Sequence, residues 1–180
     1  MQEETKEIAI VAGGCFWCTE AVFQRLQGVS KVVSGFTGGT IKNPAYREVT
    51  TERTGHAEAV EIHFDPKVIT YKELLEVFFA THDPTTLNRQ GADRGTHYRS
   101  AIFYTSIDQE QIAQDLLLDL TAEKVFDNPI VTEVTEAGAF YVAEDYHHNY
   151  YNQNSEQSYC QFVINPKLTK LQQKFKEKLK

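Results

Sequence analysis

The sequence has few cysteines and no long apolar run. Three cysteines among 180 residues are too few, and odd in number, for the disulfide framework of a small secreted domain. No stretch approaches the roughly 20 consecutive apolar residues of a membrane span, and the acidic start, Met1–Glu4, lacks the basic and then apolar pattern of a secretion signal. The sequence therefore predicts a soluble, cytoplasmic protein whose cysteines are free thiols, metal ligands or catalysts.

Positive charge is scarce as well. The formal net charge of −7 disfavours a nucleic-acid partner, because phosphates are repelled over most of such a surface. The exception is the lysine-rich C-terminus, where an apolar stripe including Leu168, Leu171 and Phe175 recurs at helical spacing. We interpret it as a terminal helix that packs its stripe on the core and not as a membrane anchor.

The chain length and its 41% hydrophobic content suit one domain over residues 1–180, which we expect to be monomeric. Apolar periodicity, capping boxes and turn residues predict the order of the elements. The first two thirds follow strand-helix-strand-strand-helix-strand, which is typical of a ferredoxin-like split βαβ core in an α+β two-layer sandwich with appended loops and a C-terminal helix. The expected strands are 7–11, 29–36, 57–64, 100–105, 130–135 and 139–142, and the expected helices are 15–27, 70–82, 106–126, a short one at 144–152, and one that Asn165-Pro166 begins.

Cys15 follows the first predicted strand and the pair Gly13-Gly14, so it lies where a helix begins. Only a thiolate attacks, and the unpaired backbone N–H groups of a first helical turn favour the charged form. We therefore expect Cys15 to be partly activated by its position alone. Cys15 is the candidate nucleophile.

Cys18 forms a C-x-x-C pair with Cys15. This pair admits three interpretations: a thioredoxin-like redox couple, half of a zinc site, or a nucleophile with an accessory thiol. Zinc is disfavoured because Cys160 and the histidines offer no second ligand pair at metal-site spacing. The bulky Phe16 and Trp17 between the two cysteines disfavour the thioredoxin-like couple and predict an apolar pocket for a small substrate group.

The segment Gly13–Trp17 resembles the active-site signature of the type A peptide methionine sulfoxide reductases. Further matching segments recur in the same order between about residue 7 and residue 166: Tyr46-Arg47, Thr54–Val60, His82–Gln90, Gly95-Thr96 before Tyr98–Ser100, and Ala143–His147 before Tyr150. The resemblance implies an oxidoreductase that converts methionine-S-sulfoxide, free or in oxidatively damaged proteins, to methionine. It further implies thioredoxin as the electron donor, with no metal and no other cofactor.

The resemblance also assigns roles to residues. Glu58 matches the family's acid, and its predicted place on the apolar face of a strand would keep it protonated near pH 7. Tyr46 and Tyr98 match phenols that hydrogen-bond the sulfoxide oxygen. Phe16 and Trp17 would hold the substrate methyl group. Asp93 would orient a tyrosine or a water molecule, and His147 and Tyr150, one turn apart on the short helix, would support the site.

Turnover leaves Cys15 as a sulfenic acid that another thiol must capture. Cys160, in a polar stretch expected to be mobile, matches the family's recycling cysteine, so we predict that Cys160 captures Cys15 and that Cys18 then accepts the disulfide. Many family members carry glycine in place of Cys18, and glutamine is usual in place of His97. The first departure bears on the recycling route, and the second bears on the pH dependence.

Two other functions fit parts of this pattern. A general protein-disulfide oxidoreductase would use Cys15 and Cys18 alone and would not need Glu58. A methionine-oxide binding or redox-sensing module would form the disulfide once and would not turn over. Loss of activity without Glu58 and steady-state consumption of reduced thioredoxin separate these alternatives from a sulfoxide reductase.

Overall fold

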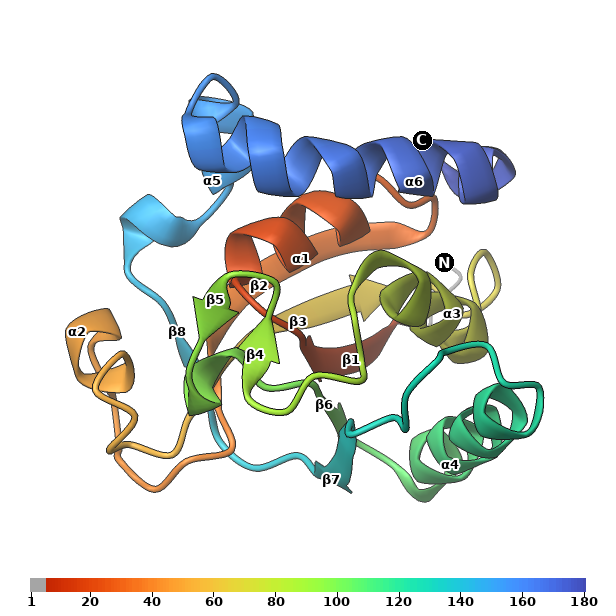
Figure 1. The fold of residues 1–180 in the computed structure, drawn as a ribbon, viewed down its shortest axis with the longest axis horizontal. Coiled ribbons are helices and arrows are strands. Elements are labelled where there is room, and N and C mark those ends of the chain that lie inside the picture. Colours follow the sequence, from red (N-terminus) through yellow and green to blue (C-terminus); the bar gives the residue numbers. More distant parts are fainter. Residues whose placement is uncertain (1–5) are drawn as a thin grey trace, which may run out of the picture.

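Strand β1 (Glu7–Ala12) lies inside a six-stranded sheet that forms the centre of the molecule (Figure 1). The structure is a computed structural model and describes residues 6–180, so the acidic start at Met1–Glu4 lies outside the described residues. The strand order is β7-β6-β1-β3-β2-β8. All neighbours are antiparallel except β6 and β7, which are parallel. The other strands are β2 (Val29–Thr37), β3 (Ala57–Phe64), β6 (Ala101–Tyr104), β7 (Glu133–Glu136) and β8 (Phe140–Val142).

The two faces of β3 differ as its alternating sequence predicts. Val60 and Ile62 join the large core between the sheet and the helices. Ala57 and Ala59 face the opposite side, where they pack in a smaller cluster with Phe103. Because side chains alternate along a strand, Glu58 shares the face of Val60 and Ile62.

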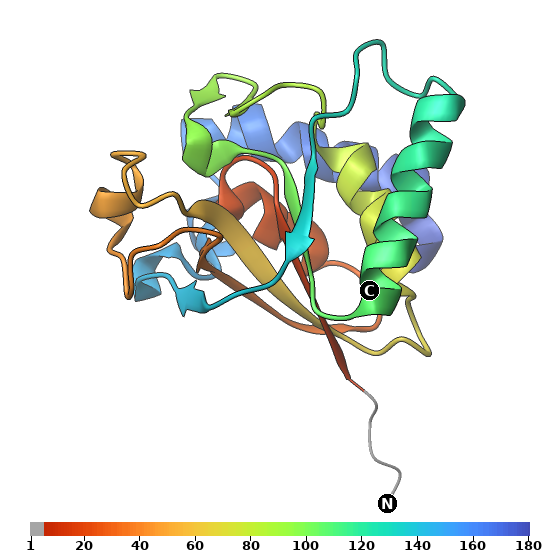
Figure 2. The same ribbon diagram turned by 90° about the horizontal axis from the view of Figure 1, so that it is seen from below.

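Helices cover the face of the sheet that carries the large core. Figure 1 shows α1 (Phe16–Phe23) against the sheet with α6 (Asn165–Phe175) across it, and Figure 2 shows α3 (Tyr71–Thr81) and α4 (Ile107–Ala122) beside them. Thr70 and Ser106 cap α3 and α4 as the sequence predicts, since each hydroxyl accepts a hydrogen bond from the backbone three residues later. The α+β prediction is confirmed.

The two long loops contain short ordered elements that the sequence pattern does not indicate. The first loop includes the four-residue helix α2 (Tyr46–Val49). The second folds into a hairpin of β4 (Arg89–Gln90) and β5 (Asp93–Arg94) and then a 3-10 turn, η1 (Thr96–Tyr98). Both loops thereby present a tyrosine at a defined position.

The expected helix over 144–152 is wrong as a single element. It consists of the 3-10 turn η2 (Asp145–His147) and the helix α5 (Tyr150–Asn154), separated by Asn149 in the left-handed region at φ 57°. An asparagine side chain tolerates that conformation and interrupts a helix. His147 and Tyr150 therefore do not lie one turn apart on one helix.

The beginning of the last helix also differs from the prediction. A π-helical turn, η3 (Cys160–Ile164), leads directly into α6, so Asn165 is the first residue of α6 and not its cap. Its side-chain oxygen accepts a hydrogen bond from the Tyr151 hydroxyl instead. Cys160 is consequently buried within this turn, and the mobility of the stretch stays a prediction.

Smaller boundary differences occur at α4 and β7. Helix α4 ends at Ala122 and does not include Phe126, which packs against the core from the following loop. Strand β7 begins at Glu133. Within residues 6–180, no helix has the length and apolarity needed to cross a membrane.

The C-terminal segment packs as the lysine-flanked stripe predicts. Leu171 is 1% exposed in the large core, and Leu168 and Phe175 pack against it. Beyond α6, the 3-10 turn η4 (Lys176–Lys178) returns the chain to the end of α1, where Gln27 donates a backbone hydrogen bond to Lys178. The stripe thus packs on the core, with Leu171 fully buried and Leu168 and Phe175 half-buried.

Candidate active site

Cys15 lies at the junction of β1 and α1, as predicted, but it caps the helix and is not its first residue. Gly14 has a φ of +84°, and a Cβ atom there would lie 2.7 Å from the Gln90 side chain, so the turn before Cys15 requires glycine. The Gly14 backbone N–H donates to the Tyr98 carbonyl over 3.1 Å, which ties this turn to η1. The Cys15 side chain is 7% exposed.

Glu58 is the carboxylic acid of the site. Its Oε1 atom accepts a hydrogen bond of 3.2 Å from the Phe16 backbone N–H in the first turn of α1, and its Oε2 atom is buried without a partner. Burial raises the pKa of Glu58 to about 8, because water is absent to solvate the carboxylate. Glu58 is therefore mostly protonated near pH 7, with one oxygen free for a ligand.

The protonation of Cys15 differs from the expectation. Burial raises the pKa of its thiol well above the ordinary value, and neighbouring Cys18 and Glu58 raise it further. Desolvation and these neighbours outweigh the dipole of one helical turn. The thiol pair instead favours ionisation at Cys18, whose pKa is lowered by a hydrogen bond from Cys15. Position alone does not activate Cys15.

Two phenols face Glu58 and Cys15 from the two long loops. Tyr46 comes from α2 and Tyr98 from η1, and the two phenols lie close enough to shift each other's pKa. Burial, then the charge of Glu58, raises the pKa of Tyr46 to about 12 and also raises the pKa of Tyr98. Both phenols therefore remain hydrogen-bond donors near pH 7. Glu144 positions Tyr46 by accepting its backbone N–H at 3.2 Å, a contact that sequence reasoning missed.

Aromatic rings surround the start of α1. The Trp17 and Tyr150 rings are parallel at a centroid distance of 3.8 Å, and the Phe16 and Tyr46 rings stack at 6.5 Å. His147 joins the two pairs, since its ring is 5.0 Å from that of Phe16 and 4.5 Å from that of Tyr46. These rings form an apolar wall beside Cys15.

His147 is a buried neutral ring and not a solvated one. The Trp17 indole N–H donates to its Nδ1 atom over 3.1 Å, so the ring proton is on Nε2, which has no partner. Burial lowers the pKa of His147. A supporting role is predicted for His147 from the sequence, and its hydrogen bond shows that it holds Trp17.

Asp93, in β5, accepts a hydrogen bond of 2.6 Å from the Tyr159 hydroxyl. The sequence predicts that Asp93 orients a tyrosine or a water molecule, and the structure places a tyrosine there. Tyr159 itself was not identified as a site residue, although its position next to Cys160 could have indicated it. His97 is buried, its ring is tilted against that of Tyr98 at a centroid distance of 3.9 Å, and burial lowers its pKa. Its neutral ring supports the phenol.

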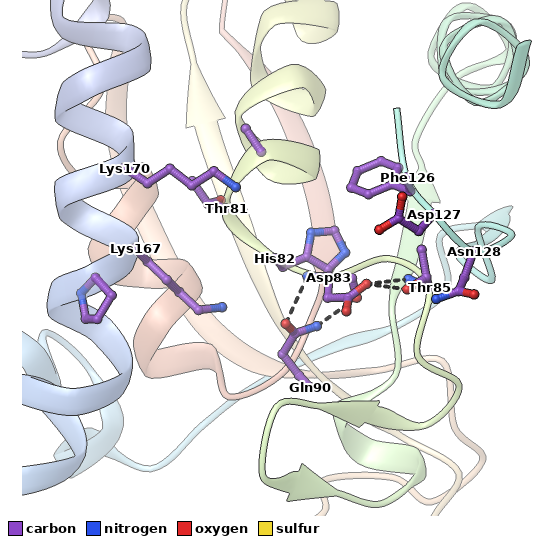
Figure 3. A pocket seen from close by; sticks show the side chains of 12 residues that line it. Thr81, His82, Asp83, Thr85, Gln90, Phe126, Asp127, Asn128, Lys167 and Lys170 are labelled. Atoms are coloured by element: carbon purple, nitrogen blue, oxygen red, sulfur yellow. Dashed lines mark hydrogen bonds between the residues drawn. The ribbon is translucent and has the colours of Figure 1, made fainter. Parts of the chain in front are cut away.

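The candidate residues do not line the open cavity of Figure 3, which has a volume of about 470 Å³. Figure 3 shows Lys167 and Lys170 extending over this cavity from α6, opposite His82, Asp83 and Gln90. Among residues 6–180, no group of three or more His, Cys, Asp or Glu side chains is arranged to hold a metal ion.

The site therefore combines a buried thiol, a protonated carboxylic acid, two phenols and an apolar wall, which together define a thiol-dependent oxidoreductase acting on a small polarised group. A family model described as peptide methionine sulfoxide reductase matches residues 7–179. The chain belongs to this family.

Relatives named peptide methionine sulfoxide reductase MsrA support the same assignment across nearly the whole chain. The protein from Deinococcus radiodurans is 59% identical over 97% of this chain and 85% of its own length. The protein from Sulfolobus acidocaldarius is 52% identical over 96% of this chain and 97% of its own length. The chain is accordingly an oxidoreductase that reduces methionine sulfoxide with a thiol.

Solved structures of the family share the fold. Reduced Mxr1 from Saccharomyces cerevisiae superposes with a TM-score of 0.79 at 30% identity, covering 88% of this chain and 91% of that one. Methionine sulfoxide reductase A of Corynebacterium diphtheriae superposes with a TM-score of 0.74 at 38% identity, covering 85% of this chain and 76% of that one.

Proposed function

We propose that this protein reduces methionine-S-sulfoxide, free or within oxidised proteins, through a Cys15 sulfenic acid and an intramolecular disulfide that thioredoxin reduces. The observation that carries this proposal is the buried Glu58 carboxyl, which has a pKa of about 8 and one unpartnered oxygen beside Cys15. A sulfoxide sulfur is a poor electrophile until its oxygen receives a proton or a strong hydrogen bond.

In the reduction step, the Cys15 sulfur attacks the sulfoxide sulfur while Glu58 donates a proton to the sulfoxide oxygen. A bond between the two sulfurs forms first. The protonated oxygen then passes from the substrate sulfur to the Cys15 sulfur as the S–O bond and the bond between the sulfurs break, which leaves Cys15 as a sulfenic acid and releases methionine. The Cys15 thiol proton replaces the one that Glu58 gave, so the carboxyl is neutral again. Tyr46 and Tyr98 hydrogen-bond the oxygen as negative charge develops on it.

Phe16 and Trp17 contact the substrate methyl group, while Tyr150 and His147 hold the indole in place. The stacked and tilted ring contacts around Trp17 and the buried imidazole support this role. An apolar wall favours the methyl sulfoxide over more polar groups. Asp93 supports the edge of the same site by accepting the hydrogen bond from the Tyr159 hydroxyl.

In the recycling steps, the Cys160 thiol attacks the sulfenic sulfur of Cys15, water leaves, and a disulfide forms. Cys18 then attacks the Cys160 sulfur, which releases Cys15 as a thiol and leaves a disulfide between Cys18 and Cys160 for thioredoxin. Cys15 lowers the pKa of Cys18, and burial and then Cys18 raise the pKa of Cys160, which supports the proximity of Cys18 to both other thiols. No metal and no cofactor besides thioredoxin take part.

We also propose that residues 1–180 form one catalytic domain, active as a monomer in the cytoplasm, where thioredoxin is available. Its core is a two-layer, ferredoxin-like split βαβ unit to which loops and the C-terminal helix are appended. The antiparallel order β6-β1-β3-β2 among the first four long strands supports this description.

An assay of both methionine sulfoxide epimers with the wild type, Cys15→Ser and Glu58→Gln tests the proposal. We expect turnover of the S epimer alone, none with Cys15→Ser, and a loss on the order of 100-fold with Glu58→Gln. Reduction of a protein disulfide that survives Glu58→Gln would instead indicate a general disulfide oxidoreductase. One equivalent of product without steady-state consumption of thioredoxin would indicate a redox sensor.

A further inference from the structure

Tyr159 connects Cys18 to Asp93 and has no part in the reduction step. Its hydroxyl lies 3.6 Å from the Cys18 sulfur and 2.6 Å from the Asp93 Oδ2 atom. Its ring meets the Trp17 ring edge to face at a centroid distance of 5.9 Å. Three separate elements, α1, β5 and the start of η3, thus meet at one phenol oxygen.

The direction of these two hydrogen bonds follows from the number of protons. A phenol has one O–H, whereas a carboxylate only accepts. Tyr159 therefore donates its proton to Asp93, and while Cys18 is a thiol the phenol oxygen accepts from its S–H. Once the proton has moved along the chain, the phenol donates to the Cys18 thiolate instead, and this hydrogen bond lowers the pKa of Cys18. The result is a continuous chain from the Cys18 S–H through the phenol to a carboxylate.

We propose that Tyr159 and Asp93 form a proton relay that deprotonates Cys18 when this thiol attacks a disulfide. The inference rests on the proposed function, because it concerns the recycling role assigned there to Cys18. Tyr159 and Asp93 act through the Cys18 thiol, so both are positioning residues for recycling.

The relay accounts for the proton that Cys18 loses when its sulfur attacks the disulfide between Cys15 and Cys160. The Cys18 proton passes to the Tyr159 oxygen as the phenol proton passes to Asp93, and the Cys18 sulfur bonds to that of Cys160. The bond between the Cys160 and Cys15 sulfurs breaks, and Cys15 leaves as a thiolate that takes up a proton. Two hydrogen bonds reverse direction. Asp93 gives its added proton to solvent, solvent supplies the proton to Cys15, and no external reductant is consumed in this step.

The other ionisable groups around Cys18 cannot take its proton. His82, which lines a small void with Cys18, uses Nδ1 on the Phe78 carbonyl and Nε2 on the Ser100 hydroxyl, and burial lowers its pKa to about 3. The charge of Lys167, on α6, lowers the pKa of the Cys18 thiol, and a lysine ammonium group has no acceptor for a proton.

The two remaining ionisable neighbours of Cys18 are Glu58 and Cys15, which belong to the reduction site. Glu58 is protonated near pH 7, and Cys15 donates its own hydrogen bond to Cys18. Burial, with the nearby Cys15 and Cys18, raises the pKa of Tyr159, so this phenol transmits a proton and does not remain ionised. Asp93 is therefore the terminal acceptor.

The test compares Tyr159→Phe with the wild type in two assays. Phenylalanine keeps the ring against Trp17 and removes only the hydroxyl. A single-turnover assay without reductant measures methionine formed per enzyme, and a steady-state assay measures reduced thioredoxin consumed. We expect an unchanged single-turnover rate and a steady-state rate at pH 7 that falls on the order of 10-fold. The steady-state rate of Tyr159→Phe should recover toward the wild type as pH rises, because Cys18 then ionises without the relay.

A second comparison shows whether Tyr159 acts through Cys18. In a Cys18→Ser background, Tyr159→Phe should cause no further loss of the residual turnover. Equal losses in both backgrounds, or a pH profile of unaltered shape, would overturn the relay and assign Tyr159 a packing role. An absent single turnover in the wild type would refute the proposed function itself.

Discussion

The indole N–H of Trp17 donates to the Nδ1 atom of His147 across 130 residues of sequence, over 3.1 Å. The imidazole is fully buried among Phe16 and Tyr46. A buried ring that accepts at Nδ1 must be neutral and must keep its proton on Nε2. This single contact fixes the orientation of the aromatic wall.

Removal of that contact should weaken substrate binding. Trp17→Phe keeps an aromatic ring and deletes the indole N–H, which leaves both His147 nitrogens unpaired. A neutral hydrogen bond contributes about 0.5–1.5 kcal/mol, so we expect KM to rise roughly 2- to 10-fold, with a smaller change in kcat. Steady-state kinetics on a methyl sulfoxide substrate measure both. A fall in kcat at unchanged KM would place Trp17 in the chemical step instead.

Glu58 should set the alkaline limit of the reduction step. Its carboxyl must be protonated to act as an acid, and its pKa is about 8. The single-turnover rate should therefore fall as pH rises through about 8. In Glu58→Gln the rate should be lower by on the order of 100-fold and should lack this limb. An alkaline limb that persists in Glu58→Gln would assign it to another group.

The same carboxyl should make folding stability depend on pH. Between its ordinary pKa of 4.5 and about 8, the folded chain holds a proton that the unfolded chain releases. The contribution of Glu58 to the free energy of unfolding therefore falls as pH rises across this window and is level above it. Thermal unfolding of the wild type and Glu58→Gln should diverge most once the pH is above about 8, with the variant the more stable.

Gly14→Ala should destabilise the turn that carries Cys15. The added Cβ atom meets the Gln90 side chain at 2.7 Å, and the φ of +84° strains any non-glycine residue. We expect a loss of about 1–3 kcal/mol in unfolding free energy and a larger loss of activity. Gly138→Ala is the matched control, because a Cβ atom there has no neighbour within 4 Å. Equal effects at both positions would show that the turn tolerates a side chain.

The order of disulfide formation is testable by peptide mapping after one turnover. Cys18→Ser should trap a disulfide between Cys15 and Cys160, because the second exchange is lost. Cys160→Ser should accumulate sulfenic acid or form a bridge between Cys15 and Cys18 only slowly. A bridge between Cys15 and Cys18 that forms at the full rate without Cys160 would reverse the proposed order.

Leu171→Ala should report how much α6 contributes to the core. Leu171 is 1% exposed, whereas Leu118 on α4 is 68% exposed. We expect a loss of about 2–5 kcal/mol for Leu171→Ala and within about 0.5 kcal/mol for Leu118→Ala. Denaturant unfolding measures both. A small effect at Leu171 would mean that α6 docks without stabilising the domain.

Local patterns in the sequence predicted most of the fold. Alternation placed β3 over Ala57–Phe64 and put Glu58 on the inner face, and capping residues placed the beginnings of α3 and α4. These features depend on neighbouring residues, so sequence alone carries them. The break at Asn149 and the π-turn before Asn165 depend on tertiary contacts, which local patterns do not contain.

The same distinction applies to the site. Cys15 and the loop tyrosines were identifiable from the motif, and the burial of Glu58 followed from strand alternation. The protonation of Cys15 was not predictable, because it depends on desolvation by the surrounding core and on its contact with Cys18. The contact of Tyr159 with Asp93 joins residues 66 positions apart, and no local pattern indicates it.

The hydrogen bond from the Gly14 N–H to the Tyr98 carbonyl constrains which changes in length the family can accept. An insertion at the hairpin tip near Gly91 extends into open space, since a Cβ atom there meets nothing within 4 Å. An insertion between Gly95 and Tyr98 would displace the Tyr98 phenol and, through the hydrogen bond to Gly14, the turn that carries Cys15. Variation in loop length should therefore be confined to the tip.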